Sequence, residues 1–152
     1  MRFDPYGADQ TAYGHVNRLA RHLGGSPLDP AIRSLVELRA SQINGCAFCL
    51  ALHSRTARQA EVPQGKLDLL AGWREATEFS AKERAALALA EQMIRIGDGR
   101  RVDEDTWAHV RAEFEDGEIA GLLYTIGLIG FWNTVNVAVE FPAAAPLPTL
   151  GE

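Results

Sequence analysis

The chain has 152 residues, a length that fits a single domain with one hydrophobic core. Hydrophobic residues make up 47% of it and charged residues 23%, which is typical of a globular protein and excludes a disordered one. The formal net charge is -5, and the 15 lysines and arginines are scattered among acids, so we expect no nucleic-acid partner.

The first ten residues do not resemble an export signal. They include Asp4, Pro5 and Gly7, where a secretory signal needs an apolar run, so we expect a cytoplasmic protein. In that reducing compartment, two cysteines three residues apart indicate a catalytic or metal-binding pair more readily than a structural disulfide.

Helical periodicity runs through the rest of the chain, and no stretch shows the sustained alternation of a half-buried strand. A first helix is predicted over residues 12–23, where a pair of glycines ends it. An Asp-Pro start signal then opens a second helix over 30–43. After an Asn-Gly pair, a third helix is predicted over 46–60, where a Val-Pro pair follows. We therefore predict an all-α, single-domain helical bundle.

The second half of the chain continues in the same way. A short helix is predicted over 66–71, and Ser80 begins a capping box that opens an amphipathic helix ending near Gly97. A further short helix is predicted over 103–114. Asp116 is the candidate cap of the helix that follows it.

The segment 119–139 carries no charged residue and is long enough to span a bilayer. Its flanks are acidic without a lysine or arginine anchor, and polar residues interrupt its surface, so we predict no membrane segment. We expect instead a central helix buried on nearly all sides, by its own subunit and also by a neighbour. The helical domain then spans 1–141. The proline- and alanine-rich tail, 142–152, is expected to be a loose end or an arm on a neighbouring subunit.

The residues that carry chemistry are Cys46, Cys49 and His53. Residues three or four apart share one face of a helix, so these three side chains form one stripe and can meet. Two cysteines at this spacing can form a disulfide with modest adjustment. Open amides at a helix N-terminus and a nearby imidazole both favour the thiolate, which is the reactive form of cysteine.

This cluster suggests a thiol peroxidase that needs no bound cofactor. We hypothesise that one thiolate attacks the O–O bond of a hydroperoxide and becomes a sulfenic acid, which the other thiol converts to a disulfide with release of water. His53 relays protons to the leaving oxygen, because an imidazole both takes and gives a proton near neutral pH. Position alone favours Cys46 as the attacking residue, since it lies nearer the helix N-terminus.

Three other interpretations stay open at this point. The same dithiol can serve a protein disulfide oxidoreductase or a redox sensor. The cysteines can also be inert core residues of a non-catalytic binding or assembly protein. Cys-x-x-Cys followed by histidine resembles half of a zinc ligand set, but His15, His22 and His109 show no ligand-like pairing with it, so we expect no metal.

The run from Glu37 to His53, ELRASQINGCAFCLALH, closely resembles the core motif of the AhpD-like alkylhydroperoxidase branch of the carboxymuconolactone decarboxylase superfamily. The similarity extends more loosely from about Asp29 through the helix at Ser80 to the late helix that contains asparagines. The resemblance implies an all-helical fold, assembly into homo-trimers or hexamers, and reduction of hydroperoxides by the cysteine pair. It also implies a dithiol reductant as partner, a lipoyl or thioredoxin-like protein.

The resemblance also assigns roles within the site. In the family the second cysteine is attacked by peroxide and the first resolves it, roles that fall on Cys49 and Cys46. The family's relay glutamate stands at the position that Ser34 occupies here. Glu37, about one helical turn further on, is either its replacement or a solvated surface acid. The superfamily's lactone decarboxylases generally lack the cysteine pair, so its presence favours redox chemistry.

The aromatic residues Trp73, Phe131 and Trp132 are candidates for the lining of an apolar substrate pocket. Aromatic side chains in such helices are more often plain core, so the lining role is the less favoured interpretation.

Overall fold

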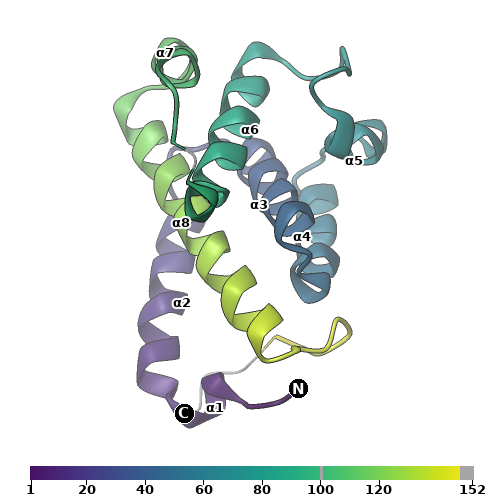
Figure 1. The fold of residues 1–152 in the computed structure, drawn as a ribbon, viewed down its shortest axis with the longest axis vertical. Coiled ribbons are helices and arrows are strands. Elements are labelled where there is room, and N and C mark those ends of the chain that lie inside the picture. The colour runs from purple at the N-terminus through teal and green to yellow at the C-terminus, as the bar shows by residue number, and fades with distance from the viewer. Residues whose placement is uncertain (100, 148–152) are drawn as a thin grey trace.

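A computed structural model describes residues 1–99 and 101–147, and every regular element in this part of the chain is a helix. The α-helices are α1 (Pro5–Ala8), α2 (Gln10–Gly24), α3 (Pro30–Asn44), α4 (Ala47–Gln59), α5 (Gln64–Leu69), α6 (Ala81–Ile94), α7 (Glu104–Glu113) and α8 (Asp116–Ala138), and two 3₁₀ turns are η1 (Leu70–Gly72) and η2 (Ile96–Asp98). The predicted all-α fold is therefore confirmed (Figure 1).

Most helix boundaries follow the capping residues in the sequence. The Asp29 side chain accepts a hydrogen bond from the backbone at the start of α3, with a proline in the first turn. Ser80 and Glu83 form the predicted capping box of α6. That helix ends at Ile94 and not near Gly97, because the chain tightens into the 3₁₀ turn η2 after it.

The predicted cap of α8 is wrong by one residue. Glu115 is the N-cap, and its backbone N–H donates to the Glu118 carboxylate at 3.0 Å. Asp116 is the first residue of the helix, and its carboxylate accepts a hydrogen bond from Arg111 at 2.7 Å. The side chain that we expected to cap α8 therefore ties α8 to α7.

Helix α3 is the element against which most of the bundle packs. It contacts α4, α6 and α8, and Figure 1 shows it in the middle of the molecule. Its buried side chains Leu35 and Val36 are at most 1% exposed. The main hydrophobic core joins this face of α3 to the apolar faces of α6 and α8. Any side chain on α3 is consequently held by a rigid support.

Helix α8 corresponds to the predicted central helix over 119–139. It is long and apolar enough to cross a membrane, a property that core helices of soluble proteins share, and it packs against α2, α3, α4 and α6. The single chain buries only 39% of the most apolar window of this helix, and the expected burial of the rest by a neighbouring subunit remains a prediction. One side of the helix faces the bundle, while Tyr124 and Phe131 on the other side are 62% and 46% exposed.

The beginning of the chain lies beside the C-terminal end of α8 (Figure 1). The Arg2 backbone N–H donates to the carbonyl of Val139 at 2.7 Å. The described part of the predicted tail, 142–147, returns to its own chain, where Ala145 packs against the cysteine-containing cluster of the core. The remainder of the predicted tail, 148–152, lies outside the described residues.

A buried carboxylate ties α6 to α3 and to the segment after η1. Glu91 accepts hydrogen bonds from Arg39 at 2.7 Å, from the Trp73 indole at 3.0 Å and from Arg74 at 2.7 Å. Burial by itself raises the pKa of Glu91, but these three hydrogen bonds outweigh burial and hold the pKa below its ordinary value of 4.5.

We expect Glu91→Gln to lower the free energy of unfolding at pH 7 by about 2–4 kcal/mol, because it leaves the Arg39 guanidinium, whose side chain is only 14% exposed, without a counter-charge. The folded state lowers this pKa, so the stabilisation is complete above pH 4.5 and is lost as the pH falls through the folded pKa. Urea unfolding at pH 7 and at steps down to pH ~3 measures it. The exposed Glu78→Gln is the control, and a stability difference that stays constant with pH would contradict the prediction.

Gly45 makes the connection between α3 and α4 in the left-handed conformation, with φ 68°. A Cβ at this position meets nothing within 4 Å, so Gly45→Ala should cost only the conformational penalty, about 1–2 kcal/mol. Gly65 lies inside α5 and also has open space, so Gly65→Ala should be neutral or stabilising by up to about 1 kcal/mol. Chemical denaturation of both variants checks this, and the same sign of change in both would refute it.

Candidate functional site

Cys46 and Cys49 are joined by a disulfide at the beginning of α4. Their Cα atoms are 5.3 Å apart, and each residue is 2% exposed. Cys46 is the N-cap of the helix, and its sulfur accepts a hydrogen bond from the backbone N–H of Cys49 at 3.3 Å. The predicted helix that opens at Cys46 therefore begins one residue later, with Cys46 as its cap, and the two cysteine side chains meet as the spacing predicted.

The connection before Cys46 determines where α4 goes. Gly45 ends α3 in the left-handed conformation, and the Cys46 N–H then donates to the carbonyl of Ser41 at 3.2 Å. The chain reverses within this short turn, so α4 packs along α3. Side chains that are well separated in the sequence, Glu37 on α3 and His53 on α4, are brought together as a result.

The His53 and Glu37 side chains form a close pair. The Nδ1 atom of His53 lies 3.1 Å from Oε2 of Glu37, and the two side chains are 12% and 22% exposed. The direction of this contact is not that of a hydrogen bond, and Nδ1 has no other hydrogen-bond partner among the described residues. The Glu37 carboxylate therefore faces the His53 imidazole at short range without a hydrogen bond between them.

A cavity of about 560 Å³ lies beside these residues. Cys49, His53, Glu37 and Ser34 all line it, whereas Cys46 is not among the described residues that do. Apolar and aromatic side chains make up much of the remaining wall, namely Tyr6, Tyr13, Phe48, Leu52, Ile129 and Trp132. Of the two cysteines, Cys49 is therefore the one that lines this cavity.

Sequence reasoning missed two residues next to Cys49. The Asn136 side-chain amide on α8 donates to the Cys49 sulfur at 3.6 Å, a normal reach for the larger sulfur atom. The Tyr6 hydroxyl donates to Oδ1 of Asn136 at 2.6 Å. Burial, with the Tyr13 and Asp4 side chains adding to it, raises the pKa of Tyr6 to about 12.

The sequence did contain a signal for each of these residues. Tyr6 lies on α1, which the sequence analysis did not predict although Asp4 and Pro5 form the same start signal that marks α3. Asn136 is a polar residue in an otherwise apolar helix, and such a residue needs a partner when it is buried. What the sequence did not contain was the identity of that partner.

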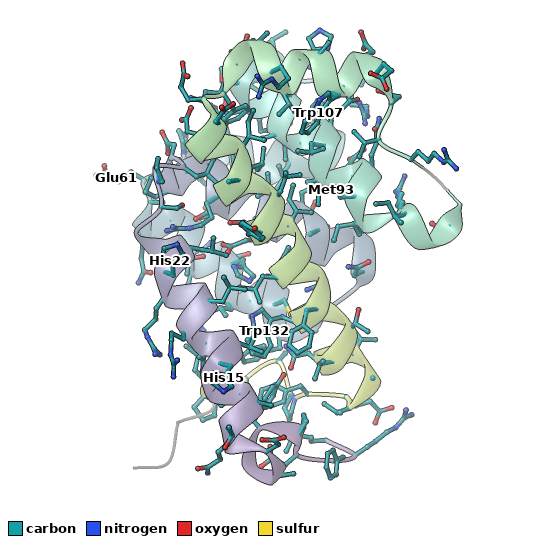
Figure 2. The ribbon with its side chains drawn as sticks, turned by 90° about the vertical axis from the view of Figure 1, so that its left-hand side faces the viewer. His15, His22, Glu61, Met93, Trp107 and Trp132 are labelled. Atoms are coloured by element: carbon teal, nitrogen blue, oxygen red, sulfur yellow. A yellow bond between two sulfur atoms is a disulfide. The ribbon has the colours of Figure 1, made fainter. Side chains whose placement is uncertain are left out.

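The other candidate residues differ in whether they line the cavity. Trp132 lines the cavity, and Figure 2 shows it on α8 facing α2. Trp73 is core and donates to Glu91, and Phe131 is exposed, so neither lines the cavity. His15 and His22 are exposed on α2 (Figure 2).

Side chains that could ligate a metal ion are dispersed over residues 1–99 and 101–147. No group of three or more histidine, cysteine, aspartate or glutamate side chains there is arranged to hold a metal ion. The chemistry that the site offers from its own side chains is that of a dithiol, an imidazole and a carboxylate.

Comparison with known proteins places this arrangement in a family. The carboxymuconolactone decarboxylase family matches residues 10–92. The uncharacterized protein YdfG of Bacillus subtilis is 32% identical over 120 residues, which cover 79% of this chain and 81% of YdfG. The uncharacterized protein YnjA of Escherichia coli is 34% identical over 118 residues, which cover 78% of this chain and 64% of YnjA.

A solved structure from Agrobacterium tumefaciens superimposes on almost the whole chain. That protein has no established function and is suggested by its name to be an antioxidant defence protein AhpD. The two are 30% identical, with a TM-score of 0.88, and the match covers 95% of this chain and 99% of the other. The family match and this structural agreement together show that the chain belongs to the carboxymuconolactone decarboxylase family, in its AhpD-like branch.

Proposed function

We propose that this protein is a thiol-dependent peroxidase that reduces organic hydroperoxides or hydrogen peroxide through a dithiol/disulfide cycle of Cys46 and Cys49. One observation carries the proposal. Cys49, one half of a pair that forms a disulfide, opens into a cavity of about 560 Å³ that also holds the His53–Glu37 pair. A nucleophile, a proton carrier and room for a small molecule therefore occur together.

In the oxidative half of the cycle, the Cys49 thiolate attacks one oxygen of the hydroperoxide. The S–O bond forms as the O–O bond breaks, which leaves a sulfenic acid on Cys49 and an alkoxide. His53 donates a proton to the alkoxide, so that an alcohol leaves, and Glu37 stabilises the protonated imidazole beforehand. The apolar walls of the cavity suit the organic part of such a substrate.

In the second step, the Cys46 sulfur attacks the Cys49 sulfur, the S–O bond breaks, and water leaves as the disulfide forms. A dithiol reductant of the lipoyl or thioredoxin type then takes up the oxidising equivalents by thiol–disulfide exchange. One hydroperoxide and two thiols thus give one alcohol, one water and one disulfide. Because this reaction removes a hydroperoxide, the protein would act as an antioxidant enzyme.

A protein disulfide oxidoreductase or redox sensor would use the same pair on a protein partner. Both cysteines are only 2% exposed, and the opening beside Cys49 is a cavity. A hydroperoxide is small enough to react within this cavity as it stands, whereas a protein thiol needs one of the sulfurs to become more exposed first. The geometry therefore favours the peroxidase over this alternative and over an inert core pair.

We expect the reduced protein to lose two thiols for each cumene hydroperoxide added. Cys49→Ser should abolish peroxide consumption, because the attacking sulfur is gone. Cys46→Ser should consume one equivalent and retain a sulfenic acid that dimedone traps. Thiol counting and mass spectrometry measure all three. Peroxide reaction no faster than that of free cysteine, together with rapid exchange with disulfides, would instead establish the oxidoreductase alternative.

A second test measures how much the Glu37 carboxylate contributes to turnover. Glu37→Gln keeps the shape of the side chain and removes the charge 3.1 Å from His53. We expect peroxide turnover to fall about tenfold or more, a part of the roughly 10²- to 10⁴-fold that general acid–base catalysis supplies.

A matched variant makes this test specific. Ser34 lines the same cavity one helical turn before Glu37, so Ser34→Glu in the Glu37→Gln background returns a carboxylate to the same face of α3. We expect this double variant to recover part of the lost turnover. Unchanged steady-state kinetics in Glu37→Gln would show that Glu37 has no part in the reaction.

A further inference from the structure

We propose that Asn136 is a further catalytic residue of this site, whose amide N–H stabilises the thiolate form of Cys49, and that Tyr6 is a positioning residue that holds this amide. The inference rests on the proposed function only in taking Cys49 as the reacting sulfur. It follows from a chain of two buried hydrogen bonds that joins α1 and α8 to the first turn of α4.

The first link is the contact with the sulfur. Asn136 Nδ2 lies 3.6 Å from the Cys49 sulfur, and both residues are at most 5% exposed. A thiolate is a much stronger hydrogen-bond acceptor than a thiol, so a fixed donor at this distance favours the ionised form. Because Cys49 is only 2% exposed, the protein must supply much of the hydrogen-bond donation that water gives to an exposed thiolate.

The two sulfurs differ in the origin of their donors. Cys46 accepts from a backbone N–H of its own helix, as an N-cap does. Cys49 lies beyond that cap, and its side-chain donor comes from α8, which is remote in sequence. Asn136 therefore supplies to Cys49 the kind of stabilisation that helix geometry already gives to Cys46.

The second link is the one that orients the amide. An asparagine amide can present either its oxygen or its nitrogen to a neighbour. The Tyr6 hydroxyl donates to Oδ1 at 2.6 Å, which leaves Nδ2 directed at the sulfur. The pKa of Tyr6 is raised to about 12 by burial and by Tyr13 and Asp4, so the phenol remains a donor throughout the pH range in which a cysteine ionises.

Other groups also act on Cys49, and the test must separate them from Asn136. The titratable side chains that line the same cavity are Tyr6 and Tyr13 from α1 and α2, Arg33 and Glu37 from α3, and His53 from α4. A substitution at Asn136 leaves all of these side chains in place, and of these side chains Tyr6 is the one that loses its hydrogen-bond acceptor. The backbone amides of the first turn of α4 are likewise left in place.

The experiment uses the reduced protein with Cys46→Ser, so that Cys49 is the one thiol, and measures its rate of alkylation by iodoacetamide against pH. For Asn136→Ala we expect the midpoint of this profile to rise by about one pH unit, the size expected for one hydrogen bond to a charged group. Tyr6→Phe should shift the midpoint in the same direction by less, because the amide remains but is no longer held.

The alkylation rates of the proteins with and without Asn136→Ala should also cross as the pH rises. A rise of one unit removes about nine tenths of the thiolate at neutral pH, but the nucleophilicity of a thiolate increases with its pKa, with a coefficient of about 0.4–0.5. Alkylation should therefore be about threefold slower below the midpoint and about threefold faster well above it. A merely loosened structure would increase the rate at every pH, so the crossing separates the two explanations.

Asn133→Ala is the matched control. Asn133 is a buried asparagine one turn earlier on α8, and it bonds Ser41 and Asn44 instead of a sulfur. Its loss should lower stability without moving the midpoint. An equal shift in this control, or an unchanged midpoint in Asn136→Ala, would overturn the inference.

A second variant covers the case in which the first one does not fold. If Asn136→Ala does not fold, which circular dichroism shows, Asn136→Asp keeps the side-chain shape and places a negative charge near the sulfur, so its midpoint should rise at least as much. An unmoved midpoint in both Asn136→Asp and Tyr6→Phe then overturns the inference. Alkylation needs no peroxide. A wild-type protein that fails to reduce hydroperoxide would therefore contradict the proposed function without affecting this measurement.

Discussion

The site depends on the tight reversal of the chain between α3 and α4. Gly45 adopts a left-handed conformation, and the next residue, Cys46, caps the following helix with its sulfur. This turn lays α4 along α3, the element to which α6 and α8 are also packed. It brings His53 to 3.1 Å from Glu37 and sets Cys49 on the wall of a cavity. The positions of Cys49, His53 and Glu37 relative to one another therefore depend on the conformation of this one glycine.

The two cysteines meet different demands although they form one disulfide. Cys46 has the better helix-terminal electrostatics, since its sulfur accepts a backbone N–H. Cys49 has the access, because its side chain lines the cavity. A nucleophile must be reached by its substrate before its ionisation matters, so access decides in favour of Cys49. The donor that its position in the helix does not provide is then found on α8, at Asn136.

Helix α8 has two functions in the fold, and its sides differ accordingly. One side closes the core and carries Asn133 and Asn136 to the α3–α4 pair, which explains why buried amides occur in so apolar a helix. The other side leaves Tyr124 and Phe131 exposed in the single chain. Assembly into trimers or hexamers, the dithiol reductant and a cytoplasmic location remain predictions.

The sequence by itself determined the helices and the reactive pair, because both depend on near neighbours. Caps, glycines and the three-to-four-residue spacing act within one or two turns, so Ser80, Cys49 and His53 could be placed from the sequence. Tertiary structure decided whether Glu37 is a partner of His53 or a surface acid, because that depends on the path of α4 along α3. It also decided which cysteine lines the cavity and which residues bond to Asn136, because contacts between α1, α4 and α8 do not produce a periodic pattern in the sequence.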